Sequence, residues 1–135
     1  MRADVARKYR SYAKNVKYGF TGGLLSTVDG SLFTNSYVWG LDLSGSLSGA
    51  GGIGGLLSAR YGTNDIVFSY DGNGNVSELT STNGAIAAHY EYDAFGQTIV
   101  ATGPLAMENP FRFSTKPYES TIRKVLYEYR VYDGD

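Results

Sequence analysis

The side chains that could carry chemistry in this sequence are a set of aspartates, one histidine and a group of serines. Asp42, Asp71 and Asp93 each stand three residues before a glycine. An aspartate that opens a four-residue turn can accept hydrogen bonds from the backbone two residues on, and glycine at the fourth position supplies a left-handed conformation. Local turn chemistry therefore accounts for these carboxylates, and we predict a structural role for them rather than acid–base catalysis.

The remaining candidates for catalysis lack partners in the sequence. His89 is the only histidine and there is no cysteine, so no His–His or Cys–His pair can form within the chain. None of the serines between residues 44 and 58 lies in a Gly-x-Ser-x-Gly elbow. We therefore expect His89 to be a cross-strand neighbour and the chain to have no catalytic residue, which makes a small hydrolase the least favoured interpretation.

Two motifs could hold a ligand, but their surroundings argue against it. The run from Asp71 to Asn75 has the alternating oxygens that open a calcium loop, yet Thr82 stands where the bidentate glutamate is expected. The glycines at 49, 51 and 54 have the spacing of a dinucleotide-binding turn, yet a strand-like segment follows at residues 66–70 and leaves no room for the helix. We predict no metal and no cofactor, and a glycine-rich crossing of closely packed backbones at residues 49–57.

The aspartates belong to a short unit that occurs twice. One copy reads Phe68-Ser-Tyr70-Asp71-x-x-Gly74 and the other reads Tyr90-Glu-Tyr92-Asp93-x-x-Gly96. Aromatic residues at alternate positions lie on one face of a strand, and the Asp-x-x-Gly turn closes a hairpin. Because a single hairpin is marginally stable in water, such units must stack in series. The predicted fold is therefore all-β, with stacked antiparallel β-hairpins.

A degenerate third copy of this unit precedes the other two. Tyr37 and Trp39 alternate before the turn from Asp42 to Gly45. We predict that Trp39, the only tryptophan, is a packing anchor; an exposed Trp could instead bind a sugar ring.

The two ends of the chain are less regular. Up to Lys17 there are six basic residues against one acidic residue, with Val5, Tyr9, Tyr12 and Val16 at helical spacing. This predicts a short N-terminal helix or a solvated strand pair that leads into the first repeat. Aromatic and basic residues do not alternate again later, so we expect no nucleic-acid binding. No run approaches the ~20 apolar residues of a membrane span, and the start lacks a signal peptide's apolar core, so we expect a cytoplasmic product as written.

The C-terminal third contains all three prolines, at positions 104, 110 and 117. We expect an extended connection here, with an aromatic strand that contains Phe111 and Phe113. Residues 122–133 fit either a helix or a strand by periodicity, and their β-branched and aromatic side chains favour a strand.

The repeated Tyr-x-Tyr-Asp-x-x-Gly unit resembles the YD repeats of Rhs proteins. The order of motifs over residues 36–116 is similar to the C-terminal part of the bacterial Rhs repeat-associated core domain. The segments that carry the resemblance are Ser36–Gly45, Gly49–Leu57, Tyr70–Val76, Tyr90–Gly96 and Glu108–Lys116. The resemblance divides the chain into a basic, loosely repeat-like lead-in (1–35), an Rhs core region (36–116) and a divergent C-terminal segment (117–135).

The resemblance implies a strip of a much larger β-shell. In this family the shell encloses a C-terminal toxin, as in polymorphic toxins, and parent proteins are often exported or secreted. The family usually continues into a Tyr-Tyr-Asp-Pro run, whereas Gly134 follows Asp133 here and the chain ends at Asp135. The family's self-cleavage motifs have no matching positions, so no catalytic residue is carried over.

We therefore expect a non-catalytic fragment of an Rhs shell. Its expected partners are further YD repeats or the toxin domain of a larger Rhs protein, with self-association through unpaired strand edges. The alternative is an extracellular adhesive or carbohydrate-binding β-module that uses exposed Tyr and Trp surfaces. The structural residues on which the first interpretation depends are Asp42, Gly45, Tyr70, Asp71, Gly74, Tyr92, Asp93 and Gly96, with Trp39 as the anchor.

Overall fold

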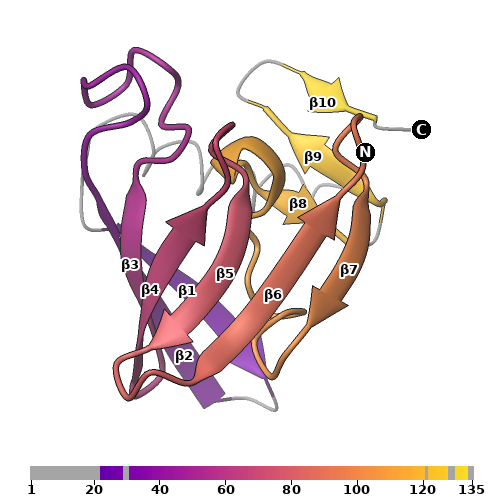
Figure 1. Cartoon of the computed structure of the whole chain (residues 1–135). Helices are drawn as coiled ribbons and strands as arrows, with labels where there is room; N and C mark the ends of the chain where they lie inside the picture. Colours follow the sequence, from indigo (N-terminus) through magenta and orange to yellow (C-terminus); the bar gives the residue numbers. More distant parts are fainter. Residues whose placement is uncertain (1–21, 29–30, 121, 128–129, 134–135) are drawn as a thin grey trace.

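The chain folds as a seven-stranded antiparallel sheet with a small second sheet behind it (Figure 1). The computed structural model describes residues 22–28, 31–120, 122–127 and 130–133, and side chains from residue 35 onward. The strands of the large sheet are neighbours in sequence order. They are β1 (Gly22–Val28), β2 (Ser31–Trp39), β3 (Leu56–Tyr61), β4 (Asn64–Tyr70), β5 (Val76–Ser81), β6 (Ile86–Tyr92) and β7 (Thr98–Thr102).

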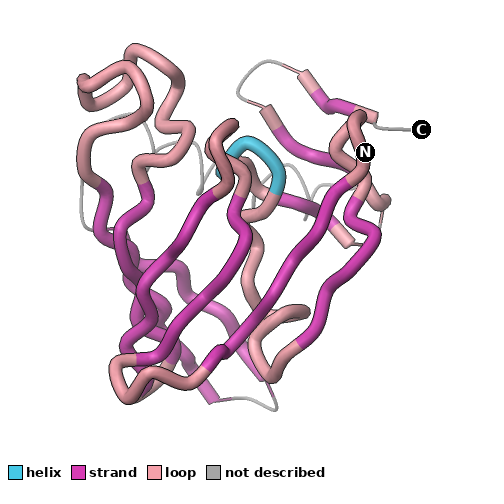
Figure 2. The backbone as a smooth tube through the Cα atoms, viewed as in Figure 1, coloured by secondary structure: helices cyan, strands magenta, loops and turns pink. Residues whose placement is uncertain are grey.

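Each strand pairs with the next through a hairpin, as the repeated unit predicts (Figure 2). β3 and β4 are joined by a two-residue loop in which Gly62 has a φ of 60°, a conformation that favours glycine. β1 and β2 pair from Gly22 opposite Tyr37 to Val28 opposite Ser31. The all-β prediction is confirmed.

A β-bulge recurs at the same point of each unit. Leu57, Ser77 and Ile99 are each the second residue of a strand and have no partner in the register of the strand before. A bulge bends the strand and increases its local twist. The sheet therefore bends at intervals that repeat with the sequence unit. The motif itself does not predict these bulges.

One face of the sheet forms the hydrophobic core. The inward positions of β2 to β6 are aromatic or aliphatic and nearly inaccessible, whereas the opposite face mixes polar and charged side chains with half-exposed aliphatic ones. The buried residues of this core are Tyr37, Trp39, Leu56, Ala59, Tyr61, Ile66, Phe68, Val76, Leu79, Ala87, Ala88, Tyr90, Ala106 and Phe111.

Residues 103–118, which we call the strap, cross the buried face of the sheet and complete this core. The expectation of an aromatic strand through Phe111 and Phe113 is wrong. Phe111 makes only an isolated bridge with Pro117, and Phe113–Thr115 form a 3-10 turn (η1). The reason is that Ser114 and Thr115 have positive φ values, which are incompatible with an extended strand.

After the strap the chain forms the second, three-stranded sheet. Its strands are β8 (Tyr118–Glu119), β9 (Lys124–Leu126) and β10 (Val131–Tyr132), in the order β10-β9-β8. The C-terminal segment is therefore extended rather than helical, but as two strands instead of one. Between them, the N–H of Tyr127 donates to the carbonyl of Arg130.

The structure leaves two predictions untested. The N-terminal helix lies outside the described residues. β2 runs through residues 35 and 36, where the sequence placed a boundary, and the three-part division stays a prediction. No helix among the described residues is long and apolar enough to cross a membrane.

Candidate functional site

The predicted turn residues occupy three loops of one design at the same end of the sheet. In each loop the glycine N–H donates to the aspartate carbonyl, and the aspartate N–H donates to the carbonyl four residues on. The φ angles of Gly45, Gly74 and Gly96 are 74°, 76° and 89°, which glycine adopts without steric cost. The Asp71 and Asp93 turns are three-residue hairpin loops with a left-handed glycine, and the Asp42 turn has the same form within the longer connection between β2 and β3.

The aspartate side chains hold these loops from inside. One Oδ atom of Asp71 accepts the N–H groups of Asn73 and Asn75, both at 2.9 Å. Asp93 accepts the N–H groups of Phe95 and Gln97 at 2.8 and 2.9 Å. The carboxylates are thus used by the backbone of their own loops.

Asp42 organises a larger loop and is more deeply buried. Its Oδ1 accepts the N–H of Ser44 at 2.9 Å, and its Oδ2 accepts those of Ala50 and Gly52 at 2.7 and 3.1 Å. Burial alone would raise the pKa of this carboxyl, but these hydrogen bonds, together with one from the Ser44 hydroxyl, outweigh it and lower the pKa to about 2. Asp42 is therefore the anchor of the glycine-rich loop between β2 and β3.

A fourth loop at the opposite end of the sheet repeats the same backbone without an aspartate. The N–H of Ser81 donates to the carbonyl of Ala85, and the N–H of Gly84 donates to that of Ser81. Asn83 accepts the N–H of Ala85 at 3.0 Å. The Asn83-Gly84 pair indicates a turn in the sequence. Because Ser81 stands where the other loops have aspartate, the motif does not predict that this loop has the same backbone form.

The second aromatic residue of each unit, a tyrosine in both copies, ties two neighbouring strands together. The hydroxyl of Tyr70, at the end of β4, donates to the carbonyl of Leu56 at the start of β3. The hydroxyl of Tyr92, at the end of β6, donates to the carbonyl of Val76 at the start of β5, at 2.8 Å. Burial raises the pKa of both hydroxyls, so they remain protonated donors.

Trp39 takes the corresponding place at the end of β2 and lies in the core. Its side chain is 7% exposed and packs edge-on against Phe111 of the strap, with 5.5 Å between ring centroids. Tyr37, 1% exposed, makes a similar contact with Phe111 at 5.1 Å. Neither ring offers a flat exposed surface to a sugar.

A buried polar network attaches the strap to the aromatic face. Asn109 accepts a hydrogen bond from the Tyr61 hydroxyl at 3.1 Å and donates to the Tyr90 hydroxyl at 3.3 Å. The same amide bonds both backbone groups of Phe111. Asn109 therefore satisfies groups from the strap and from two strands at once.

Arg112 is the buried cation of the strap. Its guanidinium lies over the rings of Tyr90 and Tyr118, at 5.3 and 4.6 Å from their centroids. It also donates to the carbonyl of Ala106 at 2.9 Å. These cation–π contacts compensate part of its lost hydration.

The end of the strap touches the tips of the Asp71 and Asp93 loops and the glycine-rich loop between β2 and β3. The Thr115 hydroxyl donates to the carbonyl of Gly74 at 2.7 Å and accepts the N–H of Gly54 at 2.8 Å. The Phe113 ring lies so close to Gly96 that an added Cβ would stand 2.6 Å from it. Gly96 is therefore needed for this close approach as well as for its backbone conformation.

The open side of the same end contains a cavity of about 520 Å³ between the Asp71 and Asp93 loops. The calcium interpretation requires free oxygens from the first of these loops. Instead, both Asp71 carboxylate oxygens accept hydrogen bonds from within the loop, and Asn75 Oδ1 accepts the N–H of Ser114. Within the described residues there is no group of three or more potential metal ligands among His, Cys, Asp and Glu.

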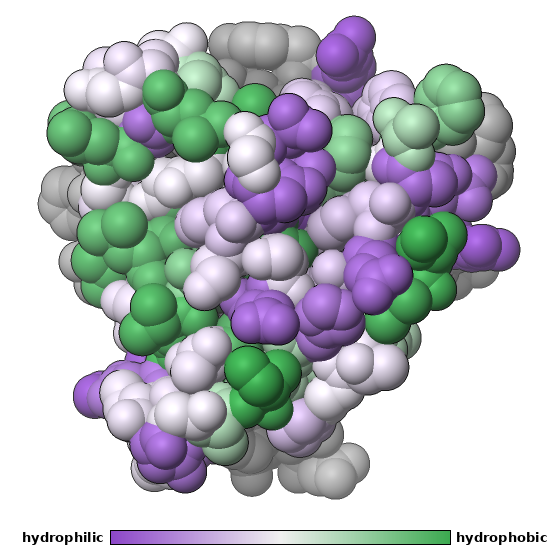
Figure 3. All heavy atoms as spheres, viewed as in Figure 1, coloured by the Kyte–Doolittle hydropathy of each residue, from purple (hydrophilic) through white to green (hydrophobic). Residues whose placement is uncertain are grey.

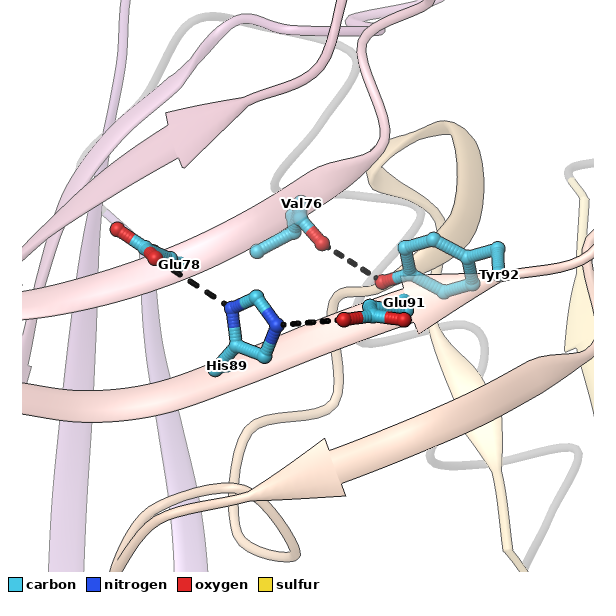
Figure 4. Close-up of polar contacts among 5 residues, drawn as sticks. All are labelled: Val76, Glu78, His89, Glu91 and Tyr92. Atoms are coloured by element: carbon cyan, nitrogen blue, oxygen red, sulfur yellow. Dashed lines mark hydrogen bonds and ion pairs between the residues drawn. The ribbon is translucent and has the colours of Figure 1, made fainter.

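His89 lies on the outer face, away from the core. It is directly opposite Glu78 of β5, with 3.4 Å between Nδ1 and Oε1, and its Nε2 lies 3.2 Å from Glu91 Oε1 (Figure 4). The three side chains are partly exposed, and the nearby Tyr92 hydroxyl is bonded to Val76 rather than to this cluster. Among the described residues, the partners of His89 are thus the carboxylates of two neighbouring glutamates.

Residues 70–105 match the family model described as RHS Repeat. The chain carries an Rhs repeat. The matched range begins at Tyr70 and includes the Tyr92-Asp93 pair, so the resemblance recognised from the paired motifs is confirmed. The Rhs repeat is a structural repeat rather than a catalytic unit.

A solved structure shows the same fold around this Rhs repeat. In the structure entitled "Crystal Structure of TcdB2-TccC3", one chain matches 84% of the present chain with a TM-score of 0.61 and 14% sequence identity. The match covers 6% of that much longer chain. No curated protein matches the sequence.

Proposed function

We propose that this chain is a non-catalytic piece of wall from a larger Rhs shell, and that the complete shell encloses a C-terminal toxin. The observation that carries the proposal is the sheet itself: an Rhs repeat forms consecutive antiparallel hairpins in strict sequence order. A sheet of this kind can be extended by adding hairpins at either edge. The similar fold that occupies 6% of a much longer chain supports such an extension.

The arrangement of polar groups supports a structural role. The repeat carboxylates hold their own turns, the tyrosine hydroxyls hold carbonyls of adjacent strands, and the buried amide of Asn109 holds the strap. The repeat aspartates, which sequence reasoning could assign to catalysis, therefore have structural partners in their own loops. The adhesive alternative needs exposed Tyr and Trp rings, and the burial of Trp39 removes the tryptophan surface on which it depends.

The shell proposal can be tested at the strand edge. In the described part of the chain, β7 pairs only with β6. We expect isolated chains to join through such edges into open-ended, polydisperse assemblies, because edge-to-edge pairing is not closed by symmetry. Ile99→Lys, on β7 and 62% exposed, should suppress these assemblies, since lysine on an edge strand blocks pairing.

The matched control is Val67→Lys, which changes a 50% exposed aliphatic residue on the central strand β4. Light scattering after size-exclusion chromatography would measure the size distribution of both variants and of the parent chain. Equal suppression by both substitutions would show that general surface hydrophobicity drives the association. A parent chain that forms no open-ended assembly would contradict the role of the edges as joining surfaces.

A further inference from the structure

The sequence contains two Asn-Gly pairs, Asn73-Gly74 and Asn83-Gly84. The glycine nitrogen of such a pair can attack the asparagine side-chain amide, because glycine has no Cβ to hinder the approach and the two groups belong to one molecule. The first pair lies in the turn between β4 and β5 and the second in the turn between β5 and β6. In both pairs the glycine N–H donates to the carbonyl three residues earlier, so this restraint is the same, but the surroundings of the two pairs differ.

The strap holds the first pair in place. The Gly74 carbonyl accepts the Thr115 hydroxyl at 2.7 Å, and a Cβ added at Gly74 would stand 2.5 Å from the Ile53 side chain. Gly74 is buried in this contact. Because ring closure turns the peptide plane between the two residues of the pair, the close packing around Gly74 opposes the reaction at Asn73.

The second pair lies at the opposite end of the sheet and is open to solvent. Residues 82–86 are all exposed, and a Cβ added at Gly84 would meet no atom of the described residues within 4 Å. This end of the molecule is at the lower left of Figure 3, where hydrophilic residues (purple) lie among residues of intermediate hydropathy (white). The peptide between Asn83 and Gly84 therefore has room to turn, and water can reach it.

The amide oxygen of Asn83 also has two hydrogen-bond donors. Its Oδ1 accepts the N–H of Ala85 at 3.0 Å and the hydroxyl of Ser81. The one proton of this hydroxyl also has the Ala85 carbonyl within reach, at 3.1 Å. When the Gly84 nitrogen attacks Cγ, Oδ1 becomes the negatively charged oxygen of a tetrahedral intermediate, and donors directed at it stabilise that charge.

The amide of Asn73 lacks this support. Within the described residues its side chain has no hydrogen-bond partner. The Asp71 carboxylate bonds the Asn73 N–H at 2.9 Å, so it disfavours a second negative charge nearby. Packing, hydrogen bonding and charge therefore all favour reaction at the second pair over the first.

We propose that Asn83-Gly84 is a site of spontaneous modification in the folded chain, favoured by the two donors on Asn83 Oδ1. The Gly84 nitrogen forms a bond to Asn83 Cγ, and its proton passes through water to the departing amide nitrogen. Ammonia leaves and a succinimide ring remains. Water then opens the ring at either carbonyl and gives aspartate or isoaspartate. The proposal goes beyond the shell role and does not depend on it, because it concerns the geometry of a single loop.

The two products differ in their effect on the hairpin. Aspartate at position 83 keeps an oxygen that accepts the N–H of Ala85, so the loop retains its form and gains one negative charge. Isoaspartate routes the backbone through the side-chain carbon and so lengthens it. This displaces Gly84, whose N–H bonds the Ser81 carbonyl, and loosens the turn between β5 and β6.

Peptide mapping by mass spectrometry of the full 135-residue chain, incubated at mildly alkaline pH, measures how fast each pair loses ammonia. We expect Asn83 to react at least about tenfold faster than Asn73, because each of two neutral hydrogen bonds to the oxyanion contributes a factor of about five. In urea that unfolds the chain, the two pairs should react at similar rates. Equal rates in the folded chain would overturn the proposal, and so would an Asn83 that stays intact while the unfolded chain reacts.

Ser81→Ala separates stabilisation of the oxyanion from flexibility of the loop. If the hydroxyl stabilises the oxyanion, its loss should slow the reaction at Asn83 by about threefold to fivefold. If the bonds of Ser81 only restrain the loop, the substitution should accelerate the reaction instead. An unchanged or faster rate would overturn the role assigned to the donors on Oδ1.

The matched control is Ser69→Ala, the same substitution at an exposed residue of β4 outside the loop. It should leave the rate at Asn83 unchanged within about twofold, since surface substitutions away from special contacts have small effects. Far-UV circular dichroism of both variants would verify that they are folded during the incubation. An equal slowing by the two substitutions would show that the effect does not come from the Ser81 hydroxyl.

Discussion

At the scale of single residues, the aspartate of the Asp-x-x-Gly motif bonds more distant parts of the chain in one copy than in the other two. Asp71 and Asp93 each bond the backbone of their own short loop. Asp42 reaches eight and ten residues along the chain to Ala50 and Gly52. The difference comes from the glycine-rich insertion between β2 and β3, whose backbone folds over the carboxylate and buries it.

Replacing Asp42 by Asn should therefore cost more stability than replacing Asp93 by Asn. The amide introduced at position 42 would direct an NH₂ group or a weaker acceptor at backbone donors, and we expect a loss of about 2 kcal/mol at pH 7, against about 1 kcal/mol or less at Asp93. Urea denaturation would measure both free energies of unfolding. Equal losses would show that the long-range bonds of Asp42 contribute nothing beyond the local turn.

The pH dependence of the Asp42 contribution has a definite sign. The folded state holds the pKa of this carboxyl at about 2, below the value of about 4 in an unfolded chain. The carboxylate therefore stabilises the fold above pH 4, and this contribution is lost as the pH falls from about 4 to about 2. The difference in stability between the parent chain and Asp42→Asn should shrink over that interval, and a constant difference would contradict the assignment.

At the scale of elements, the strap turns a strip of hairpins into a two-layered structure. Its central residue is Asn109, 1% exposed, which bonds Tyr61 and Tyr90 of the sheet and both backbone groups of Phe111. Phe111 then fills the space between the Tyr37 and Trp39 rings. The polar network fixes where the aromatic side chains of the strap enter the core.

Asn109→Ala should destabilise the chain by about 2–4 kcal/mol, because it leaves buried groups of Phe111 without partners. Tyr61→Phe removes a single hydroxyl and should cost about 1 kcal/mol. Chemical denaturation provides the measurement. The free energies of unfolding of the two variants are compared with the same slope for their dependence on denaturant concentration. A cost below about 1 kcal/mol for Asn109→Ala would mean that water replaces the amide and that the strap is not anchored at this residue.

At the scale of the whole molecule, the sheet and the strap share one core. The Thr115 hydroxyl joins Gly54 and Gly74, and residues of the strap contact strands from β2 to β6. Elements that share a core in this way open together, whereas short strands at the margin open locally. β10, with two residues and one neighbouring strand, lies at such a margin.

Native-state hydrogen exchange should therefore show the amides of β4 and β5 exchanging only by global unfolding, and those of β10 by local opening. Asn109→Ala should lower the protection of β4 and β5 by the same free energy as it lowers global stability, although it changes neither strand. If only strap amides lose protection while β4 is unaffected, the strap would be a separate folding unit.

The sequence alone determined the repeat, the hairpins and the turn residues of this protein. These depend on local physics: alternation selects the face of a strand, and the Asp-x-x-Gly spacing contains its own hydrogen-bond acceptor and its own left-handed residue. The same locality made the Rhs resemblance recognisable from Tyr70-Asp71 and Tyr92-Asp93.

Only the tertiary structure decided what lies over the aromatic face. The strap enters a 3-10 turn at Phe113–Thr115 instead of an extended strand, because Thr115 satisfies groups of Gly54 and Gly74, which are 61 and 41 residues away. The burial of Trp39 likewise depends on Phe111, 72 positions later in the chain. Contacts between such distant residues follow from how the hairpins curve and which side chains then fit between them, and no local pattern contains that information.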